Sequence, residues 1–565
     1  MGDSINTIQE LVDNLFFMPE FFPQIFRNGE EIISFSNYEF YERVVGISKG
    51  LIDFGLKSGN RVALIGDNSH NWFASSLAIN YAGLIDVPRG TDSSKEELDY
   101  ILNHSDSKIA IVDDSAVDKL SLDNNKIIKF SELNDFSKNG FKKNIHFEIL
   151  KPEDTASIIY TSGTTGNPKG VELTHKNFLS NANATLNFLG DISNDKLLSV
   201  LPPWHVFGRM EKYVALMGGA EMFYTNPKNF PNDLVEQSPT IIVSVPRIWE
   251  SVYDKITKNP KIRKFNSMKD GLIKKALKPI VYLKLKKVAK EKLGGQVRLI
   301  VSGGGGLPYK IDKFFDDINI EVLEGYGMTE ASPVISARTP RSHALGTIGK
   351  PLKGVSVEIR DEDDNVLNAN QEGMIYVKGP NVMKGYFKHP IETRKVLKGS
   401  WLETGDMGFI REDGNLVFTG RSKELIVLTG GENIHPNRLE DLLSTSPYIT
   451  NAFVFGDYYD GSKNQSLAKI GALIAPDEDY LKEFCQENHV PVDYNHEVVK
   501  QLYKSEIIKL VNDRQPPQSR IYDFRFIEPF RVGFELTQSM KLKRNDIIRN
   551  YHRKTILEMI PKLRK

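Results

Sequence analysis

The chain has 565 residues, of which 73 are basic and 73 acidic, and its hydrophobic content of 40% is typical of a globular protein. This balance excludes a global field that would attract nucleic acid, and the length leads us to expect two to four domains. The single cysteine, Cys485, excludes an internal disulfide and a cysteine zinc cluster. Together with a start that lacks a signal-peptide pattern, it favours a reducing, cytoplasmic compartment.

No uncharged apolar run approaches the ~20 residues that span a bilayer. The longest candidate, Trp72–Ile85, contains Ser75, Ser76 and Asn80 and stops at Asp86. We therefore expect this run to form a buried helix rather than a membrane span.

Helices alternate with short apolar strands through the first half of the chain. We expect strands at residues 61–66, 108–113, 156–160, 240–245 and 297–302. Strand, helix, strand at this spacing predicts parallel sheets with crossover helices. From about 346 to 420, short strands such as 355–359 and 373–377 alternate with tight turns and predict a β-rich subdomain, and a smaller α+β segment with charged helices follows Arg421.

Residues 254–292 form a basic stretch with fourteen Lys or Arg against three Asp or Glu, interleaved with apolar side chains. Pro260 and Pro279 are expected to break it into at least two helices. A basic amphipathic face can rest on an anionic membrane, where each cation adds about 1 kcal/mol. Peripheral contact with the inner face of a membrane is one interpretation, and a solvated helix on a neutral protein is the other.

The loop Thr161–Gly170 is the most informative motif. It follows the apolar strand at 156–160 and is rich in Gly, Ser and Thr, so that backbone amides and hydroxyls can converge on a phosphate chain whose charge Lys169 offsets. It differs from a Walker A loop, because Pro168 precedes the lysine and Gly170 follows it. An ordinary surface turn is the alternative for such a loop taken alone.

The loop resembles the phosphate loop of the adenylate-forming (AMP-binding) ligases, which include acyl-CoA synthetases, luciferases and peptide-synthetase adenylation domains. Six further segments resemble motifs of this family in the same order: Pro202–His205, Ser302–Pro308, Gly325–Glu330, Trp401–Asp406, Gly420–Glu424 and Leu536–Arg544. The resemblance implies an α/β fold with a large N-terminal AMP-binding domain of parallel sheets, residues 1–422, including the β-rich subdomain. A small mobile α+β domain, residues 423–565, would follow.

The resemblance, together with the chemistry of the side chains, predicts a nucleotide site. Glu330 suits Mg²⁺, Thr329 the α-phosphate, Tyr326 the adenine face, and Asp406 with Arg421 the ribose. The predicted cofactor-binding residues are Thr161, Ser162, Gly163, Thr164, Thr165, Gly166, Lys169, Gly304, Gly305, Tyr326, Gly327, Asp406, Arg421, Lys423 and Gly431. Taken one at a time, each of these residues could instead have a purely structural role, for example as a surface carboxylate or a core aromatic.

Lys541, Thr329 and His205 are the predicted catalytic residues. A cation at Lys541 would reach both the substrate carboxylate and the α-phosphate, with Lys543 as the neighbouring alternative. His205 would orient the acid or close its pocket, although a lone His after Trp is often a core residue. In the family the C-terminal domain swings about a hinge after the first half-reaction, which here implies a hinge at Lys423 and entry of the glycine loop containing Gly431.

The acid is indicated by Ser244–Tyr253, which resembles the Val-Pro-Arg segment of long-chain fatty acyl-CoA synthetases, as does Asp86–Asp92. Trp204 departs from the residue that is commoner in that branch. The resemblance implies that ATP, Mg²⁺ and coenzyme A serve the activation of a long-chain fatty acid to acyl-AMP and then acyl-CoA. A medium-chain or aromatic acid, transfer to a carrier protein, and an ATP-binding module without turnover are the alternatives; chain length and oligomeric state stay open.

Overall fold

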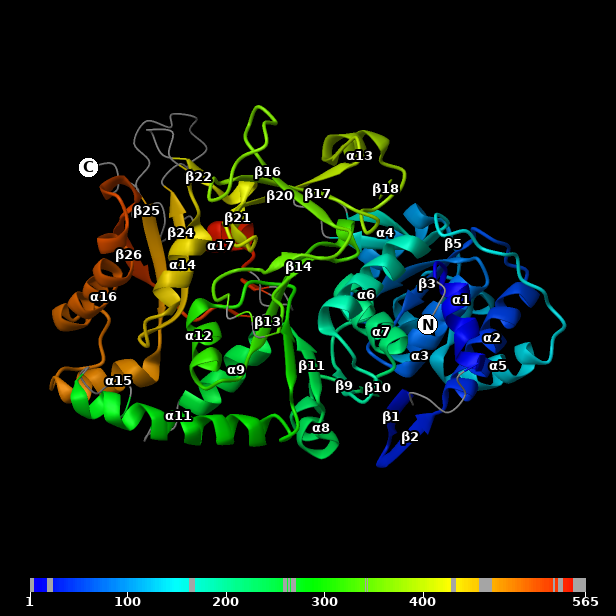
Figure 1. Cartoon of the computed structure of the whole chain (residues 1–565), viewed down its shortest axis with the longest axis horizontal. Coiled ribbons are helices and arrows are strands. Elements are labelled where there is room, and N and C mark those ends of the chain that lie inside the picture. Colours follow the sequence, from blue (N-terminus) through cyan, green and yellow to red (C-terminus); the bar gives the residue numbers. More distant parts are fainter. Residues whose placement is uncertain are drawn as a thin grey trace.

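The computed structural model describes residues 5–17, 24–161, 168–257, 262, 265, 271–340, 342, 344–427, 433–456, 470–531, 534–536 and 542–551. A large α/β body contains the N-terminus, and a smaller lobe built from the last part of the chain lies at the opposite end (Figure 1).

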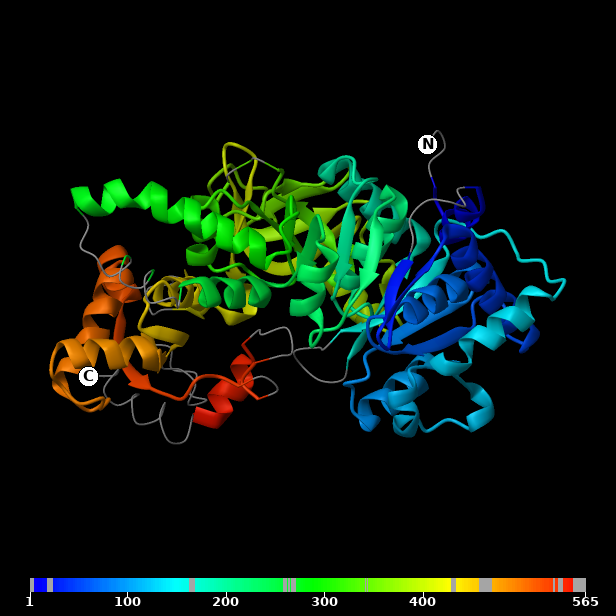
Figure 2. The same ribbon diagram turned by 90° about the horizontal axis from the view of Figure 1, so that it is seen from below.

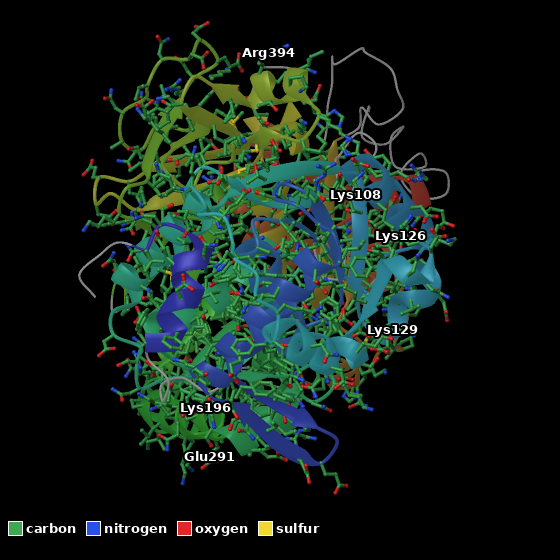
Figure 3. All side chains as sticks on the ribbon, turned by 90° about the vertical axis from the view of Figure 1, so that its right-hand side faces the viewer. Lys108, Lys126, Lys129, Lys196, Glu291 and Arg394 are labelled. Atoms are coloured by element: carbon green, nitrogen blue, oxygen red, sulfur yellow. The ribbon has the colours of Figure 1, made fainter. Side chains whose placement is uncertain are left out.

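The first sheet of the large body has seven strands in the order β18-β8-β7-β4-β3-β5-β6. They are β3 (Arg61–Ile65), β4 (Ile85–Arg89), β5 (Ser107–Val112), β6 (Ile127–Lys129), β7 (Thr155–Thr161), β8 (Lys169–Thr174) and β18 (Gly385–Tyr386). Neighbours from β7 to β6 run parallel, whereas β7 and β8 form an antiparallel hairpin. The outer end carries charged side chains such as Lys108 and Lys126, each about half exposed (Figure 3).

Helices cover this sheet, as its strands require. They are α1 (Ile8–Phe17), α2 (Asn37–Asp53), α3 (His70–Tyr81), α4 (Lys95–Ser105) and α5 (Leu133–Phe141). Every residue of α3 from Trp72 to Tyr81 is buried, so this part of the apolar run Trp72–Ile85 forms a buried helix as expected, whereas Ile85 already begins β4. Burial on both faces explains why β3 and β5 read as continuous apolar runs.

The second sheet has nine strands in the order β15-β14-β13-β12-β11-β9-β10-β1-β2. They are β1 (Gln24–Asn28), β2 (Glu31–Phe35), β9 (Lys196–Ser199), β10 (Glu221–Tyr224), β11 (Ile241–Ser244), β12 (Leu299–Ser302), β13 (Val322–Gly327), β14 (Val334–Ala337) and β15 (Lys350–Pro351). Strands β13 to β1 are parallel in sheet order.

Alternate side chains of the second sheet enter two different cores, because successive residues of a strand point to opposite faces. Ile241 and Val243 of β11 pack in the core that holds α6 (His175–Leu189) and α7 (Val206–Gly218). Ile242 packs in the other core, with Trp249 and Leu285. That core holds α8 (Phe230–Gln237), α9 (Pro246–Thr257), α11 (Leu272–Lys292) and α12 (Tyr309–Asp317).

The β-rich part forms its own sheet, in the order β16-β17-β20-β19 with β21 beside β20. Its elements are β16 (Ser356–Arg360), β17 (Gly373–Lys378), α13 (Pro390–Val396), β19 (Leu397–Lys398), β20 (Trp401–Ile410) and β21 (Leu416–Arg421). The terminal lobe, seen at the end away from the N-terminus in Figure 2, is α+β. It contains β22 (Ile426–Val427), β23 (Asn433–Ile434), α14 (Pro436–Ser444), β24 (Ile449–Gly456), β25 (Ile470–Pro476), α15 (Glu478–Glu487), α16 (Glu497–Leu510), β26 (Ile521–Phe526) and α17 (Arg544–Tyr551).

The basic stretch corrects one expectation. Pro279 was expected to end a helix, but α11 continues through it from Leu272 to Lys292. Proline removes the hydrogen bond to the carbonyl four residues earlier, at Lys275, and residues 275–280 are exposed, so water can hydrate that carbonyl. No helix within the described ranges is long and apolar enough to cross a bilayer.

Candidate active site

One large cavity of about 4140 Å³ is bounded by both sheets of the large body, by the β-rich part and by the terminal lobe. Every predicted site residue that the structure describes lines it. These are Thr161, Lys169, His205, Gly304, Gly305, Tyr326, Gly327, Thr329, Glu330, Asp406, Arg421 and Lys423. Ser162, Gly163, Thr164, Thr165, Gly166, Gly431 and Lys541 lie outside the described residues.

The β7–β8 hairpin holds both ends of the predicted phosphate loop. Thr161 ends β7 and pairs in register with Lys169, which begins β8. The Lys169 Nζ atom lies 3.1 Å from Glu392 Oε2 on α13. Lys395 and Lys169 together lower the pKa of Glu392 to about 2, so this carboxylate stays ionised near neutral pH. The Lys169 and Glu392 side chains are 28% and 33% exposed, which leaves the Lys169 ammonium accessible to a second anion from the cavity.

Glu330 is the candidate magnesium ligand and sits in the 3₁₀ turn η4 (Thr329–Ala331), directly after β13. Its Oε1 accepts a 2.8 Å hydrogen bond from the Tyr386 hydroxyl, and burial raises its pKa. A nearby cation would offset this desolvation. Among the described residues there is no cluster of three or more His, Cys, Asp or Glu that could hold a metal. The Glu330 carboxylate is of the type that holds Mg²⁺ in proteins, where one or two carboxylates and phosphate oxygens complete the coordination.

A second constellation suits a nucleoside. The Tyr326 hydroxyl on β13 donates a 2.8 Å hydrogen bond to Asp406 Oδ2 on β20. Arg421 pairs with Asp406 across the β20–β21 ladder, its Nε atom 3.5 Å from Oδ1. Burial and the Asp406 carboxylate raise the pKa of Tyr326 well above its ordinary value, so the hydroxyl keeps its proton. A fixed carboxylate beside an aromatic ring and a guanidinium can bind ribose hydroxyls next to a planar base.

Two glycines allow close approaches in this region. A Cβ at Gly303, after β12, would lie 2.8 Å from the ring of Phe207, and one at Gly327 would lie 2.0 Å from the Pro333 carbonyl oxygen. Gly304 adopts φ +78°, which a larger residue rarely adopts. The glycine-rich turn thus brings bare backbone to the cavity beside Phe207.

His205 is the N-cap residue of α7, and its ring stacks on Trp204 with centroids 4.0 Å apart. The Arg89 guanidinium lies over the ring of Trp204, 5.4 Å from its centroid. Arg89 Nη1 also donates to the Tyr160 carbonyl at 2.9 Å, and Nη2 pairs with Glu97. Through Arg89, the stack of Trp204 and His205 is therefore connected to Tyr160 on β7, one residue before Thr161.

The terminal lobe reaches the cavity through the segment that surrounds Lys541. Leu536 and Leu542 form an antiparallel bridge, and both line the cavity together with Lys543. Arg544 follows and forms an ion pair with Glu440 Oε2 at 2.5 Å and with Glu424 Oε2 at 3.3 Å. These contacts attach the terminal motif to the lobe next to the 3₁₀ turn Ser422–Glu424 that contains Lys423.

Sequence reasoning missed the roles of Tyr386, Glu392 and Arg89. Tyr386 and Glu392 meet partners 56 and 223 residues away, and no spacing signals such pairs. The sequence did contain an indication for Arg89, because this residue lies in the Asp86–Asp92 segment that resembles one branch of the family.

Comparison with known proteins gives a consistent result. A family described as AMP-binding enzyme matches residues 23–387, and one described as AMP-binding enzyme C-terminal domain matches 423–559. The probable acyl-activating enzyme 16, chloroplastic, of Arabidopsis thaliana is 30% identical over 92% of this chain and 84% of its own length. The long-chain-fatty-acid–[acyl-carrier-protein] ligase AEE15, chloroplastic, of the same plant is 31% identical over 90% and 80%. The long-chain-fatty-acid–CoA ligase FadD15 of Mycobacterium bovis is 30% identical over 78% and 76%.

Solved structures agree on the fold. ATP-bound MatB from Rhodopseudomonas palustris superposes with a TM-score of 0.77 at 22% identity, covering 97% of this chain and 99% of that one. The anthranilate CoA ligase AuaEII superposes with a TM-score of 0.78 at 18% identity, covering 97% and 98%. The expected α/β fold, with a large N-terminal domain of parallel sheets and a smaller C-terminal domain, is confirmed. The chain belongs to the AMP-binding enzyme family, the ATP-dependent adenylate-forming ligases.

Proposed function

We propose that this protein activates a long-chain fatty acid with ATP and Mg²⁺ to acyl-AMP and pyrophosphate, and then transfers the acyl group to coenzyme A with release of AMP. The observation that carries the proposal is the cavity itself. It joins the nucleotide constellation of Tyr326, Asp406 and Arg421 to a deep apolar part between the second sheet and helices α6 and α7. The apolar lining consists of Phe188, Leu189, Leu197, Leu201, Met210, Val214, Ile241, Val243, Val301 and Leu323.

An alkyl chain is the ligand that such a lining favours, since burying apolar surface contributes about 25 cal/mol per Å². The names of the relatives support the same substrate class, because several are long-chain fatty acid ligases. One of them uses an acyl carrier protein as acceptor, which keeps transfer to a carrier protein as the second candidate. Benzoate-like acids are the third, because AuaEII is an anthranilate ligase.

In the proposed first half-reaction two anions must approach each other, so the chain has to supply positive charge and hydrogen-bond donors. Lys169 would pair with the phosphates in exchange for Glu392, and the Thr161 and Thr329 hydroxyls would donate to them. Mg²⁺ on Glu330 would neutralise phosphate charge. Lys541 would bridge the carboxylate and the α-phosphate, and His205, held by its stack on Trp204, would border the reacting carboxylate.

In the proposed second half-reaction the terminal domain, residues 423–565, rotates about Lys423 and exchanges Lys541 for the loop containing Gly431. Lys423 is a suitable hinge because it lies between the end of β21 and the start of β22, and hinge residues at the ends of elements absorb backbone changes. Lys541→Ala should then abolish adenylate formation and spare thioester formation from supplied acyl-AMP. Lys543→Ala is the matched control and should affect adenylate formation much less; equal loss in both half-reactions for Lys541→Ala would contradict the assignment.

The substrate test is thioester formation by the purified chain with ATP and Mg²⁺, using fatty acids of graded length, benzoate and cinnamate. Coenzyme A and a holo acyl carrier protein serve as separate acceptors. A maximum at long chains with coenzyme A is expected. A maximum with the aryl acids would contradict the proposal of a long-chain fatty acid as substrate. Thioester formation only on the carrier protein would contradict the proposal of coenzyme A as acceptor.

We also propose peripheral contact with an anionic membrane through α11, the helix of the basic stretch 254–292. Its inner side buries Leu285 and Ala289 and lines the cavity, whereas its outer side exposes Leu277, Ile280 and Leu283, the last at 71%. Exposed lysines flank these residues, namely Lys275, Lys278, Lys284, Lys287 and Lys290. Apolar side chains among lysines suit a lipid surface, from which a fatty acid could reach the cavity directly.

Sedimentation with vesicles tests this contact. Binding to vesicles containing phosphatidylglycerol, weak binding to pure phosphatidylcholine and loss of binding in Ile280→Ser/Leu283→Ser are expected. Lys108→Glu/Lys126→Glu, at the far end of the molecule, is the matched charge control (Figure 3). Equal binding by the α11 variant and the wild type would contradict the proposal.

A further inference from the structure

One side of α7 forms part of the cavity wall. Phe207, Met210, Glu211 and Val214 all line the cavity, at a spacing that places them on one face of the helix. Three of the four are apolar, as the wall of an alkyl pocket requires. Glu211 is the exception.

Glu211 is buried, with 4% of its surface exposed. Neither of its carboxyl oxygens has a hydrogen-bond partner of normal geometry within the described part of the chain. Burial raises the pKa of Glu211 to about 7, and the neighbouring Lys212 and Ser199 oppose that rise. A buried polar group without a partner is unfavourable, so its presence on the cavity side calls for a ligand.

Pairing with Lys212 does not account for this carboxyl. The Lys212 ammonium donates to Ser199 Oγ at 3.0 Å and to the Gly208 carbonyl at 3.1 Å, and it forms no hydrogen bond with either oxygen of the Glu211 carboxyl. Position 211 also lies one turn beyond Phe207, which touches the glycine turn at Gly303. The carboxyl is therefore displaced from the nucleotide constellation toward the apolar part of the cavity.

We infer that Glu211 forms a polar subsite in the acyl pocket that takes the hydroxyl group of a hydroxylated fatty acid. This inference rests on the proposed function and narrows its substrate class. A hydroxyl both donates and accepts, so it can pair with the carboxyl in either protonation state. The substrate hydroxyl must lie at the position along the acyl chain that reaches α7 when the carboxylate of the fatty acid is at the nucleotide.

The experiment measures kcat/KM for hexadecanoate and for a set of monohydroxyhexadecanoates that differ in hydroxyl position, with the full chain, ATP, Mg²⁺ and coenzyme A. The wild type should prefer one position, or a narrow range of positions, over all others by about tenfold, the worth of one hydrogen bond. Glu211→Leu should lose that preference and use hexadecanoate better. Glu211→Gln, which still donates and accepts, should keep most of it.

Met210→Leu is the matched control, because it alters the same wall without changing its polarity and should leave the ratio between hydroxylated and plain acids unchanged. A flat positional profile in the wild type overturns the subsite without any variant. An unchanged ratio in Glu211→Leu also overturns it and makes Glu211 a structural companion of Lys212. A chain that is inert with hexadecanoate and with every hydroxylated acid contradicts the proposed function itself.

Discussion

Replacing Arg209 with methionine tests how the wall of the acyl pocket is held in place. Arg209 on α7 forms a bidentate ion pair with Asp86 on β4, with distances of 3.0 and 3.1 Å, and both side chains are fully buried. Ser76 and Ser157 donate to the same carboxylate. The pair connects the first sheet to the helix that begins after His205.

The expected loss follows from the burial of both charges. Arg209→Met leaves the Asp86 carboxylate with two hydroxyl donors and no counter-charge, and removing one member of a buried pair costs about 3–5 kcal/mol. Contacts of the guanidinium with the rings of Trp72 and Phe178, at 5.1 and 5.3 Å, are lost as well. The double variant Asp86→Asn/Arg209→Met removes both charges and should therefore be more stable than Arg209→Met alone.

Calorimetric unfolding of the wild type, both single variants and the double variant measures the coupling between Asp86 and Arg209. The midpoints should fall in the order wild type, double variant, then either single variant. Activity should follow the same order, because α7 carries Phe207 and Glu211. A double variant whose loss equals the sum of the two single losses would refute the reasoning, since it would show that the charges do not depend on each other.

Three further predictions concern individual side chains of the cavity. Because the folded-state pKa of Glu211 is raised to about 7, its stabilising contribution is complete below pH 4.5 and is lost as the pH rises through 7. Relative to Glu211→Gln, the wild type should lose up to roughly 3 kcal/mol between pH 5 and 8 in urea unfolding, and a constant difference would contradict the shift. Tyr326→Phe, which loses the bond to Asp406, should raise KM for ATP about three- to tenfold at unchanged kcat in initial-rate assays. Arg89→Lys keeps the charge but loses the planar stack on Trp204, so kcat should fall about fivefold at constant KM for ATP; an unchanged kcat would count against the stack.

Local patterns predicted many of the elements. The strands expected at 61–66 and 108–113 are β3 and β5 within one or two residues, because strands buried on both faces need continuous apolar runs. The expected helix break at Pro279 was wrong, because exposure of that turn lets water replace the lost hydrogen bond and the helix continues. The domain boundary at 422, the role of Lys541 and the roles of the nucleotide residues stay predictions.

The sequence by itself determined the order of the motifs and the residue types of the nucleotide site, because these depend on short segments that carry their chemistry with them. Only the tertiary structure decided which side chains those residues meet. Tyr386 reaches Glu330, Glu392 reaches Lys169, and Glu211 lies in the cavity wall with no hydrogen bond to its carboxyl oxygens from the residues that the structure describes. Such relations join segments that are distant in the chain, and they arise because sheets and helices pack to bury apolar surface, which no local spacing encodes.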